Sequence, residues 1–421
     1  MNFAVPDDIA AFLREVDQFI DDKIKPLEQQ DDNIRFFDHR RENARTDWER
    51  DGLPKREWEA LLRQAKDLAI EAGIFNYPFP QEYGGRDGSN LGMAIIREHL
   101  AAKGLGLHND LQNEHAVVGN NLGLLLMLQY GTEEQKARWL DGLQSASEAF
   151  AFGITEPAHG SDATYMETTA VRDGDIWIIN GEKIWNTGVH TAQADLVLAR
   201  TAGGPGDGLG ITAFLVPMDA PGLQVEEYLW TFNMPSDHAH VTFKDVRVPH
   251  SAIFGGEGKG LMVIQHFFNE NRIRQAASSL GAAQYCVDEA VKHANERKPF
   301  GKPLASNQGI QFPLVDLNAR CEMLRALLHK TAWLMDRDGA FSASEKVSIC
   351  NYQANRLVCE AADFAMQVHG GMGYSRYKPF EHIYRHHRRY RITEGADEIQ
   401  MRRAAGYLFG FMQHRKPKGV S

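Results

Sequence analysis

The chain has few cysteines and lacks long apolar runs. Its 421 residues include only four cysteines, at spacings that fit neither a disulfide framework nor a metal site. No apolar run approaches the roughly 18 residues that a membrane span needs, and the first residues lack the basic and apolar regions of an export signal. We therefore expect a soluble, cytoplasmic protein in which Cys286, Cys321, Cys350 and Cys359 are small buried hydrophobic residues.

The sequence also lacks an excess of positive charge. Its formal net charge of −10 argues against a nucleic-acid partner, because binding a phosphate backbone needs a cationic surface. The basic segment 382–391 is the exception, and we favour salt bridges or an anionic ligand there. His382 and His386 stand at the i, i+4 spacing of zinc ligands, but three neighbouring arginines would repel a cation, so we expect no metal site.

Two changes of periodicity predict three domains. Helical spacing of apolar residues, with a capping box at 132–135, predicts an N-terminal α-helical domain over 1–148. Short β-branched runs predict a middle antiparallel β domain over 149–256, and Asp-Gly at 173–174 and Asn-Gly at 180–181 each predict a hairpin turn. Helical spacing returns over 257–421. The overall prediction is an α+β protein that ends in a four-helix bundle.

Within the C-terminal part, one apolar stripe supports the bundle. Leucines and a cysteine step three and four residues apart, which favours a plain four-helix core over an extended coiled coil because the stripe is short. Its members are Leu314, Leu317, Cys321, Leu324 and Leu328. A helix over 345–369 is expected to end at the glycine pair 370–371. The charged segment 31–50 lacks periodicity and is expected to be an exposed insertion or loop.

Two segments rich in glycine, proline and hydroxyl residues carry the strongest chemical signal. Residues 153–162 read Gly-Ile-Thr-Glu-Pro-Ala-His-Gly-Ser-Asp, and residues 185–188 read Trp-Asn-Thr-Gly. Backbone N–H groups and hydroxyls in tight turns can bind a phosphate, and an indole can pack on a flat ring. Together they form a hypothesis for a flavin site.

Glu394 is the sharpest single candidate for catalysis. It follows the basic segment and directly precedes Gly395, so its carboxylate can project from a break between a helix and a turn. Taken alone, however, such a residue is more often a solvated loop glutamate.

Five ordered motifs make the chain resemble the acyl-CoA dehydrogenase family along nearly its whole length. They are Ile-Thr-Glu-Pro with Gly-Ser-Asp at 154–162, Gly-Glu-Lys-Ile-Trp-Asn-Thr-Gly at 181–188, Glu-Arg-Lys-Pro-Phe-Gly-Lys at 296–302 with Gln308, Gln-Val-His-Gly-Gly-Met-Gly at 367–373, and Ile-Thr-Glu-Gly at 392–395. The resemblance implies FAD-dependent α,β-dehydrogenation of an acyl-CoA thioester to a trans-2-enoyl-CoA in fatty-acid β-oxidation. It also implies a homodimer or homotetramer and an electron-transferring flavoprotein as electron acceptor.

The resemblance also implies the roles of individual residues. Glu394 would remove the α-proton while the β-hydride passes to flavin N5. FAD contacts would come from Phe152, Ile154, Thr155, Gly160, Ser161, Trp185 and Thr187. Contacts to the FAD of a neighbouring subunit would come from Arg297, Phe300, Gln308, Gln367 and Gly371. The substrate would lie against Ser161, Asn269 and Arg272.

Some residues depart from the family pattern, and other functions remain open. His159 and Tyr165 replace small residues of the first motif, and Ala396 stands where a threonine is usual. Some relatives carry the base directly before an arginine on another helix, where this chain has Asn271, which cannot act as a base. The alternatives are an acyl-CoA oxidase or a flavin monooxygenase on the same fold, and a non-catalytic acyl-CoA-binding protein. Glu394 counts against the monooxygenase, and the intact flavin motifs count against the non-catalytic protein.

Overall fold

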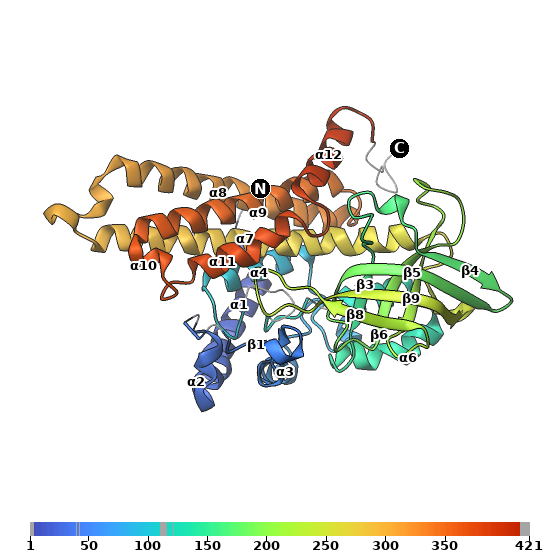
Figure 1. Ribbon diagram of the computed structural model, residues 1–421. Coiled ribbons are helices and arrows are strands. Elements are labelled where there is room, and N and C mark those ends of the chain that lie inside the picture. The colour runs from blue at the N-terminus through green and yellow to red at the C-terminus, as the bar shows by residue number, and fades with distance from the viewer. Residues whose placement is uncertain (1–3, 39, 42, 110–115, 121, 413–421) are drawn as a thin grey trace. The chain divides into compact units, whose positions relative to one another are not determined.

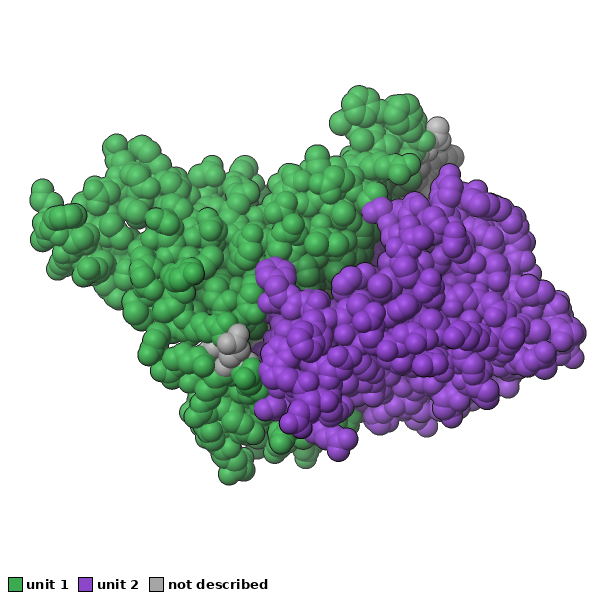
Figure 2. All heavy atoms as spheres, viewed as in Figure 1, with its two compact units in different colours: residues 1–44, 57–120, 269–421 green, residues 45–56, 121–268 purple. Residues whose placement is uncertain are grey.

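The computed structural model describes residues 4–38, 40–41, 43–109, 116–120 and 122–412. The chain divides into two compact units, coloured separately in Figure 2. Unit 1 comprises residues 1–44, 57–120 and 269–421, and unit 2 comprises residues 45–56 and 121–268. Within the described residues, no helix is both long enough and apolar enough to cross a bilayer.

A mixed sheet forms the frame of unit 2, in green and yellow in Figure 1. Within the described residues it has eight strands: β3 (Phe150–Gly153), β4 (Thr169–Asp173), β5 (Ile176–Thr187), β6 (Ala194–Arg200), β7 (Ile211–Pro217), β8 (Leu223–Tyr228), β9 (His238–Pro249) and β10 (Ile253–Phe254). The order is β10-β7-β6-β4-β5-β9-β8, and β3 pairs with β6. Most pairs are antiparallel as predicted, but β3 and β4 each run parallel to β6, so the sheet is mixed and the prediction of an antiparallel domain is corrected on this point.

One of the two predicted turns, at 180–181, is instead part of the continuous strand β5. The turn at 173–174 joins β4 to β5 as expected, but β5 continues through Asn180 and Gly181 to Thr187. The register against β9 shifts at this point, and Gly181 has a φ of 143°. A Cβ at Gly181 would lie 2.5 Å from Thr168 Oγ1, so the glycine here permits a β-bulge and close packing. The bulged strand therefore carries residues 185–187, and Gly188 follows its last residue.

Short helices and a small strand pair complete unit 2. The helices are α5 (Leu122–Tyr130) and α6 (Glu133–Gln144), and β1 (Thr46–Asp47) pairs with β2 (Leu53–Pro54). The predicted capping box is confirmed, because Thr132 and Gln135 exchange main-chain to side-chain hydrogen bonds at 3.1 and 3.2 Å. The segment 31–50 is not a plain loop: it holds short 3₁₀ turns and strand β1, and its residues 39 and 42 lie outside the described residues.

Unit 1 is helical. Its elements are α1 (Asp7–Phe19), a π-helical stretch (Ile20–Ile24), α2 (Lys25–Gln29), α3 (Arg56–Glu71), α4 (Asn90–Ala102), α7 (Gly260–Glu296), α8 (Gln308–Asp338), α9 (Ser344–His369), α10 (Gly371–Tyr374), α11 (Phe380–Arg388) and α12 (Asp397–Leu408). Residues 260–268 of α7 belong to unit 2, and the rest of this helix belongs to unit 1. In Figure 1 the long helices α7, α8 and α9 run alongside one another.

The bundle core follows the predicted stripe. All five stripe residues, 314, 317, 321, 324 and 328, are buried in one cluster with residues of α4, α7, α9 and α11. Helix α9 ends at His369 as predicted, and Gly370 has the positive φ of 60° that favours glycine there. The four cysteines are free and buried, and burial raises the pKa of the Cys350 thiol to about 12. Packing therefore fixes the helices that carry the site residues of unit 1.

Replacing Leu328 by alanine tests this core. Leu328 has no exposed surface, so Leu328→Ala is expected to lower the free energy of unfolding by about 2–5 kcal/mol through lost burial and a cavity. Lys330→Ala, two residues along the same helix at an exposed position, is expected to change it by less than about 0.5 kcal/mol. Urea unfolding followed by far-UV circular dichroism measures both, and equal losses would contradict the assigned core.

Candidate functional site

The two flavin-motif segments lie side by side in unit 2. The main-chain N–H of Ile184 donates to the carbonyl oxygen of Thr155 at 2.9 Å. Lys183 Nζ lies 2.8 Å from Glu156 Oε1 and 3.3 Å from the carbonyl oxygen of Ile154. Two segments that are about thirty residues apart in the chain are thus joined by one main-chain bond and one ion pair.

That ion pair is buried. The Lys183 side chain has no exposed surface, and the Glu156 side chain is 4% exposed. Burial alone would raise the pKa of Glu156, but Lys183 and the main-chain N–H groups of Glu167 and Thr168 hold this pKa below its usual value. Since removing either partner would leave an unpaired charge in the interior, the pair fixes the two segments relative to each other.

On the 185–187 segment, side chains alternate between the surface and the interior. The Trp185 indole is 49% exposed, and the Thr187 hydroxyl is exposed and lies 2.9 Å from Nδ1 of His238. Between them, Asn186 is buried and donates to the carboxyl of Asp195 at 2.5 Å, and burial raises the pKa of Asp195 to about 7. An aromatic ring and a hydroxyl are therefore exposed on either side of Asn186, whose side chain is anchored in the interior.

The first motif presents its turn to solvent. Gly160 and Ser161 are exposed, and a Cβ at Gly160 would meet only Thr155 Cγ2, at 3.8 Å. The ring of Phe152 is half-buried and stacks on Phe267, with 4.5 Å between centroids. The main chain at 160–161 is thus open to a ligand, while Phe152 already packs inside unit 2.

His159 holds this turn through two neighbouring carboxylates. Its Nδ1 lies 2.8 Å from Asp162 Oδ2, and its Nε2 lies 3.7 Å from Glu167 Oε1. The hydrogen bond to Asp162, together with the nearby carboxylates, raises the pKa of His159 above 6.5. His159 therefore makes an ion pair across the segment that contains Gly160.

In unit 1, Glu394 lies between the 3₁₀ turn Arg389–Arg391 and α12. Its carboxylate accepts hydrogen bonds from Asn271 Nδ2 at 3.0 Å, from Gln275 Nε2 at 2.5 Å and from Thr393 Oγ1 at 3.2 Å. Glu394 is half-buried and is not the solvated loop residue that its sequence position alone suggests.

The main chain around Glu394 is also held by side chains. Its carbonyl oxygen accepts from both Nε and Nη2 of Arg272, and from Nε2 of Gln400 at 3.0 Å. Buried Asp397, three residues later, pairs with Arg356 at 2.8 Å and with Arg391 at 2.9 Å. The turn that carries Glu394 is therefore tied to α7, α9 and α12.

The predicted substrate residues lie in different surroundings. Arg272 is buried and contacts the Glu394 main chain. Asn269 is fully buried, and its Nδ2 donates to the carbonyl oxygen of Ala340 and to Ser344 Oγ, both at 3.2 Å. Asn269 thus connects helices inside unit 1. Ser161 belongs to unit 2, on the exposed turn.

The five residues expected to reach a neighbouring subunit gather at one end of the bundle. His293 of α7 stacks on His369 of α9, with 4.2 Å between ring centroids, so the C-terminal ends of these helices are adjacent (Figure 1). All five predicted residues are exposed at that end: Arg297, Phe300, Gln308, Gln367 and Gly371. Along α7, the rise of a helix places this end about 39 Å from Asn271. These five residues therefore lie far from Glu394 of the same chain.

Backbone strain coincides with three predicted site residues. Among the described residues, nine that are not glycine have a positive φ, and five of these are aspartates, which tolerate it best. The other four are Ala146, Trp185, Phe300 and Glu394, with φ of 51°, 67°, 55° and 49°. Bulky residues in this conformation cost on the order of 1–3 kcal/mol and concentrate at functional sites.

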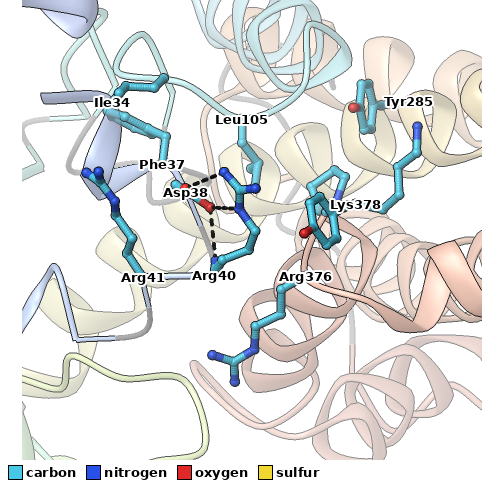
Figure 3. Close-up of a pocket in the computed structure, with 11 residues that line it drawn as sticks. Ile34, Phe37, Asp38, Arg40, Arg41, Leu105, Tyr285, Arg376 and Lys378 are labelled. Atoms are coloured by element: carbon cyan, nitrogen blue, oxygen red, sulfur yellow. Dashed lines mark hydrogen bonds and ion pairs between the residues drawn. The ribbon is translucent and has the colours of Figure 1, made fainter. Parts of the chain in front are cut away.

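Unit 1 also has a cavity of about 550 Å³. It is lined by residues 34, 37, 38, 40 and 41, by Leu105 and Tyr285, and by the 376–379 turn, and Figure 3 shows its ion pair between Arg40 and Asp38, at 2.6 Å. No predicted site residue lines it. In the part of the chain that the structure describes, no group of three His, Cys, Asp or Glu side chains is arranged to hold a metal ion.

Comparison with known proteins identifies the family. Three family descriptions match in order: acyl-CoA dehydrogenase N-terminal domain over 30–147, middle domain over 151–246 and C-terminal domain over 258–408. The chain belongs to the acyl-CoA dehydrogenase family of FAD-dependent oxidoreductases. The predicted family, α+β fold class, enzyme class and cofactor are confirmed.

Individual relatives agree with this assignment. The probable acyl-CoA dehydrogenase YngJ of Bacillus subtilis is 36% identical over 332 residues, 78% of this chain and 85% of that protein. The bovine mitochondrial short-chain specific acyl-CoA dehydrogenase is 34% identical over 339 residues, 80% of each. A solved glutaryl-coenzyme A dehydrogenase in complex with glutaryl-CoA superimposes with a TM-score of 0.82 at 28% identity, over the whole of both chains.

The sequence motifs do not include the side chains that support the candidate site. In the sequence alone Asn271 stands out only as a residue that cannot act as a base, and Gln275 belongs to no motif. Their i, i+4 spacing puts two amides on one face of α7, and this spacing was the available signal. Glu156 and Lys183 both lie within sequence motifs of the family, but only the fold shows that their side chains meet.

The His159–Asp162 pair predicts a measurable pH dependence. Because the folded-state pKa of His159 is raised above 6.5, its stabilising contribution is complete below pH 6.5 and is lost as the pH rises through the raised pKa. An NMR titration of the His159 ring should therefore give a midpoint above 6.5, and Asp162→Asn should lower that midpoint. A midpoint at or below 6.5 in the wild type would contradict the pair.

Proposed function

We propose that the protein catalyses FAD-dependent α,β-dehydrogenation of an acyl-CoA thioester to the trans-2-enoyl-CoA, with Glu394 as the base. The observation that carries this proposal is the Glu394 carboxylate, held by Asn271 and Gln275 on a strained turn whose carbonyl is bound by Arg272. A half-buried carboxylate with fixed oxygens can accept a proton from a neighbouring carbon acid. Family membership supports acyl-CoA as the substrate.

The residues of unit 2 suit the flavin. We propose that Trp185 packs on its ring, that Thr155 and Thr187 hydrogen-bond to it, that Phe152 and Ile154 line its edge, and that the turn at 160–161 meets the diphosphate. The exposed indole on a strained backbone, the outward hydroxyl of Thr187 and the open space at Gly160 support this fit. When bound, FAD supplies the acceptor for the hydride. The chain itself holds the proton, on Glu394, and orients the thioester.

We further propose that a second subunit completes each site, in a homodimer or homotetramer. The exposed cluster at the far end of the bundle supports this, because helix α7 separates it from Glu394 of the same chain. An electron-transferring flavoprotein is the proposed electron acceptor, in fatty-acid β-oxidation in the cytoplasm. The four free, buried cysteines suit a reducing compartment. The proposed domains are 1–148, 149–256 and 257–421.

Glu394→Gln tests the base. The variant keeps the shape of the side chain and removes its ability to take a proton. It is expected to purify yellow, and acyl-CoA is expected to bleach its flavin anaerobically about 10²–10⁴-fold more slowly than in the wild type. A panel of acyl-CoA thioesters, followed by flavin absorbance, measures the rate. Bleaching at the wild-type rate would remove Glu394 from the mechanism.

The same preparation separates the alternatives. Slow reoxidation of the bleached wild type in air is expected of a dehydrogenase, and reoxidation within seconds would favour an oxidase. A colourless protein that does not take up FAD would favour a non-catalytic acyl-CoA-binding protein.

Mixing two inactive variants tests the second subunit. Glu394→Gln lacks the base, and Arg297→Glu is expected to lose activity by disrupting the FAD contact across subunits. If each site combines Glu394 of one chain with Arg297 of another, unfolding and refolding an equal mixture restores about a quarter of wild-type activity, because half of the dimers are mixed and hold one intact site. The two substitutions in a single chain, refolded alone, are the inactive control. No recovery in the mixture would place both residues at the same subunit's site.

A further inference from the structure

Two amides on one face of α7 donate to the Glu394 carboxylate, one to each oxygen. Asn271 is 4% exposed and Gln275 is 3% exposed, and their amide nitrogens lie 3.0 Å from Oε1 and 2.5 Å from Oε2. An amide can exchange the places of its oxygen and its NH2 group by turning over. These two contacts therefore depend on neighbours that fix which end of each amide faces Glu394.

Arg274 fixes the orientation of Asn271 through Asn120. A guanidinium group can only donate, and Arg274 Nη1 lies 2.8 Å from Asn120 Oδ1 and 2.6 Å from the Asn120 carbonyl oxygen. Asn120 therefore turns its NH2 group to Asn271, whose Oδ1 lies 3.1 Å away. With its oxygen taken, Asn271 faces Glu394 with its own NH2 group.

Asn351 of α9 fixes Gln275 in the same way. Its Nδ2 lies 3.2 Å from the carbonyl oxygen of Arg272 and 3.5 Å from Oε1 of Gln275. A main-chain carbonyl can only accept, so Asn351 presents its NH2 group, and Gln275 turns its oxygen to Asn351. The NH2 group of Gln275 then faces Glu394. Each of these two chains of hydrogen bonds, called relays below, begins at a group that can only donate or only accept. Each ends at an NH2 group that donates to Glu394.

We propose that Asn271 and Gln275 are positioning residues that keep the Glu394 carboxylate ionised and aimed, and that Arg274, Asn120 and Asn351 act through them. A protonated carboxyl offers less acceptor capacity than a carboxylate, so fixed donors on both oxygens favour the ionised form. The consequence for catalysis rests on the proposed role of Glu394 as base. The effect on its ionisation does not.

The donor variants used below replace neutral amides only, so none of them removes a charged group around the turn. Arg272 of α7 donates to the carbonyl of Glu394, and Arg403 of α12 acts on Arg272 electrostatically. Asp397 is paired with Arg356 of α9 and with Arg391. Glu270 lies 3.3 Å from Arg274. A change caused by removing one neutral amide is therefore separable from a change in these charges.

Infrared spectroscopy tests the relay without any substrate. The carboxyl stretch of Glu394, isolated by subtracting the spectrum of Glu394→Gln, reports its protonation as the pH is varied in the FAD-loaded protein. Asn271→Leu removes one donor at similar volume and is expected to raise the titration midpoint by about one pH unit. Asn120→Leu is expected to raise it by less. The double variant should shift no further than Asn271→Leu, because Asn120 acts through Asn271.

Kinetics provides the second readout and a matched control. Anaerobic bleaching by butyryl-CoA or octanoyl-CoA should show the same shift of its acidic limb in Asn271→Leu, with an unchanged concentration for half-saturation. Gln284→Met removes another amide from α7, one that donates to Asp288 at 2.9 Å and to Asn318 at 3.2 Å, and should leave both readouts unchanged. Gln275→Met removes the other donor and is expected to act in the same direction, so it replaces Asn271→Leu if that variant does not fold.

The two proposals fail differently. An unchanged infrared midpoint in the folded donor variants overturns the relay, whatever the enzyme's activity. Shifts that add in the double variant overturn the order Arg274–Asn120–Asn271. Wild-type bleaching by Glu394→Gln overturns the base, while the infrared titration still decides the relay.

Discussion

A glutamate in a left-handed turn keeps its strained backbone only if surrounding side chains supply the hydrogen bonds that a regular helix would provide. At Glu394 that supply comes mainly from α7: Arg272 binds its carbonyl oxygen, and amides one residue before and three residues after Arg272 bind its carboxylate. Three residues within one turn of a single helix thus hold both the main chain and the carboxylate of Glu394. The position of the proposed base is therefore set by the sequence of α7 as much as by the turn that carries it.

In unit 2, an ion pair instead of neutral hydrogen bonds holds the site segments in position. There the Lys183–Glu156 pair ties two segments together in the interior, where an unpaired partner would be costly. Unit 1 uses neutral amides next to Glu394 instead. A lysine in place of Asn271 would also stabilise the carboxylate, but its full positive charge would lower the pKa of that carboxyl further and make it a weaker base. The amides give direction to the carboxylate without neutralising it. The ion pair lies in the interior of unit 2, and the neutral hydrogen bonds lie at the proposed base in unit 1.

Sequence patterns predicted the features that depend on local chemistry. The capping box at Thr132, the apolar stripe of α8 and the end of α9 at Gly370 each rest on a few neighbouring residues, and each is present. The prediction of a hairpin turn at 180–181 was wrong because an Asn-Gly pair is compatible with a β-bulge as well as with a hairpin turn. Only the pairing of β5 with β9 decides between the two. Asn120, Asn351 and Gln275 escaped prediction for another reason: they come from distant segments and carry no signature of their own.

Helix α7 connects both ends of the proposed chemistry through an unbroken 37-residue helix. A helix transmits distance and rotation together: each residue adds about 1.5 Å and about 100°. Inserting or deleting one residue between Gln275 and Arg297 would swing the far end of the bundle to another side as well as displace it. Only an insertion or deletion of about seven residues, which is two full helical turns, would nearly restore the direction in which the far end of the bundle faces. The length of this segment is therefore a constraint on how the chain can vary by insertion, separate from the identity of any side chain in it.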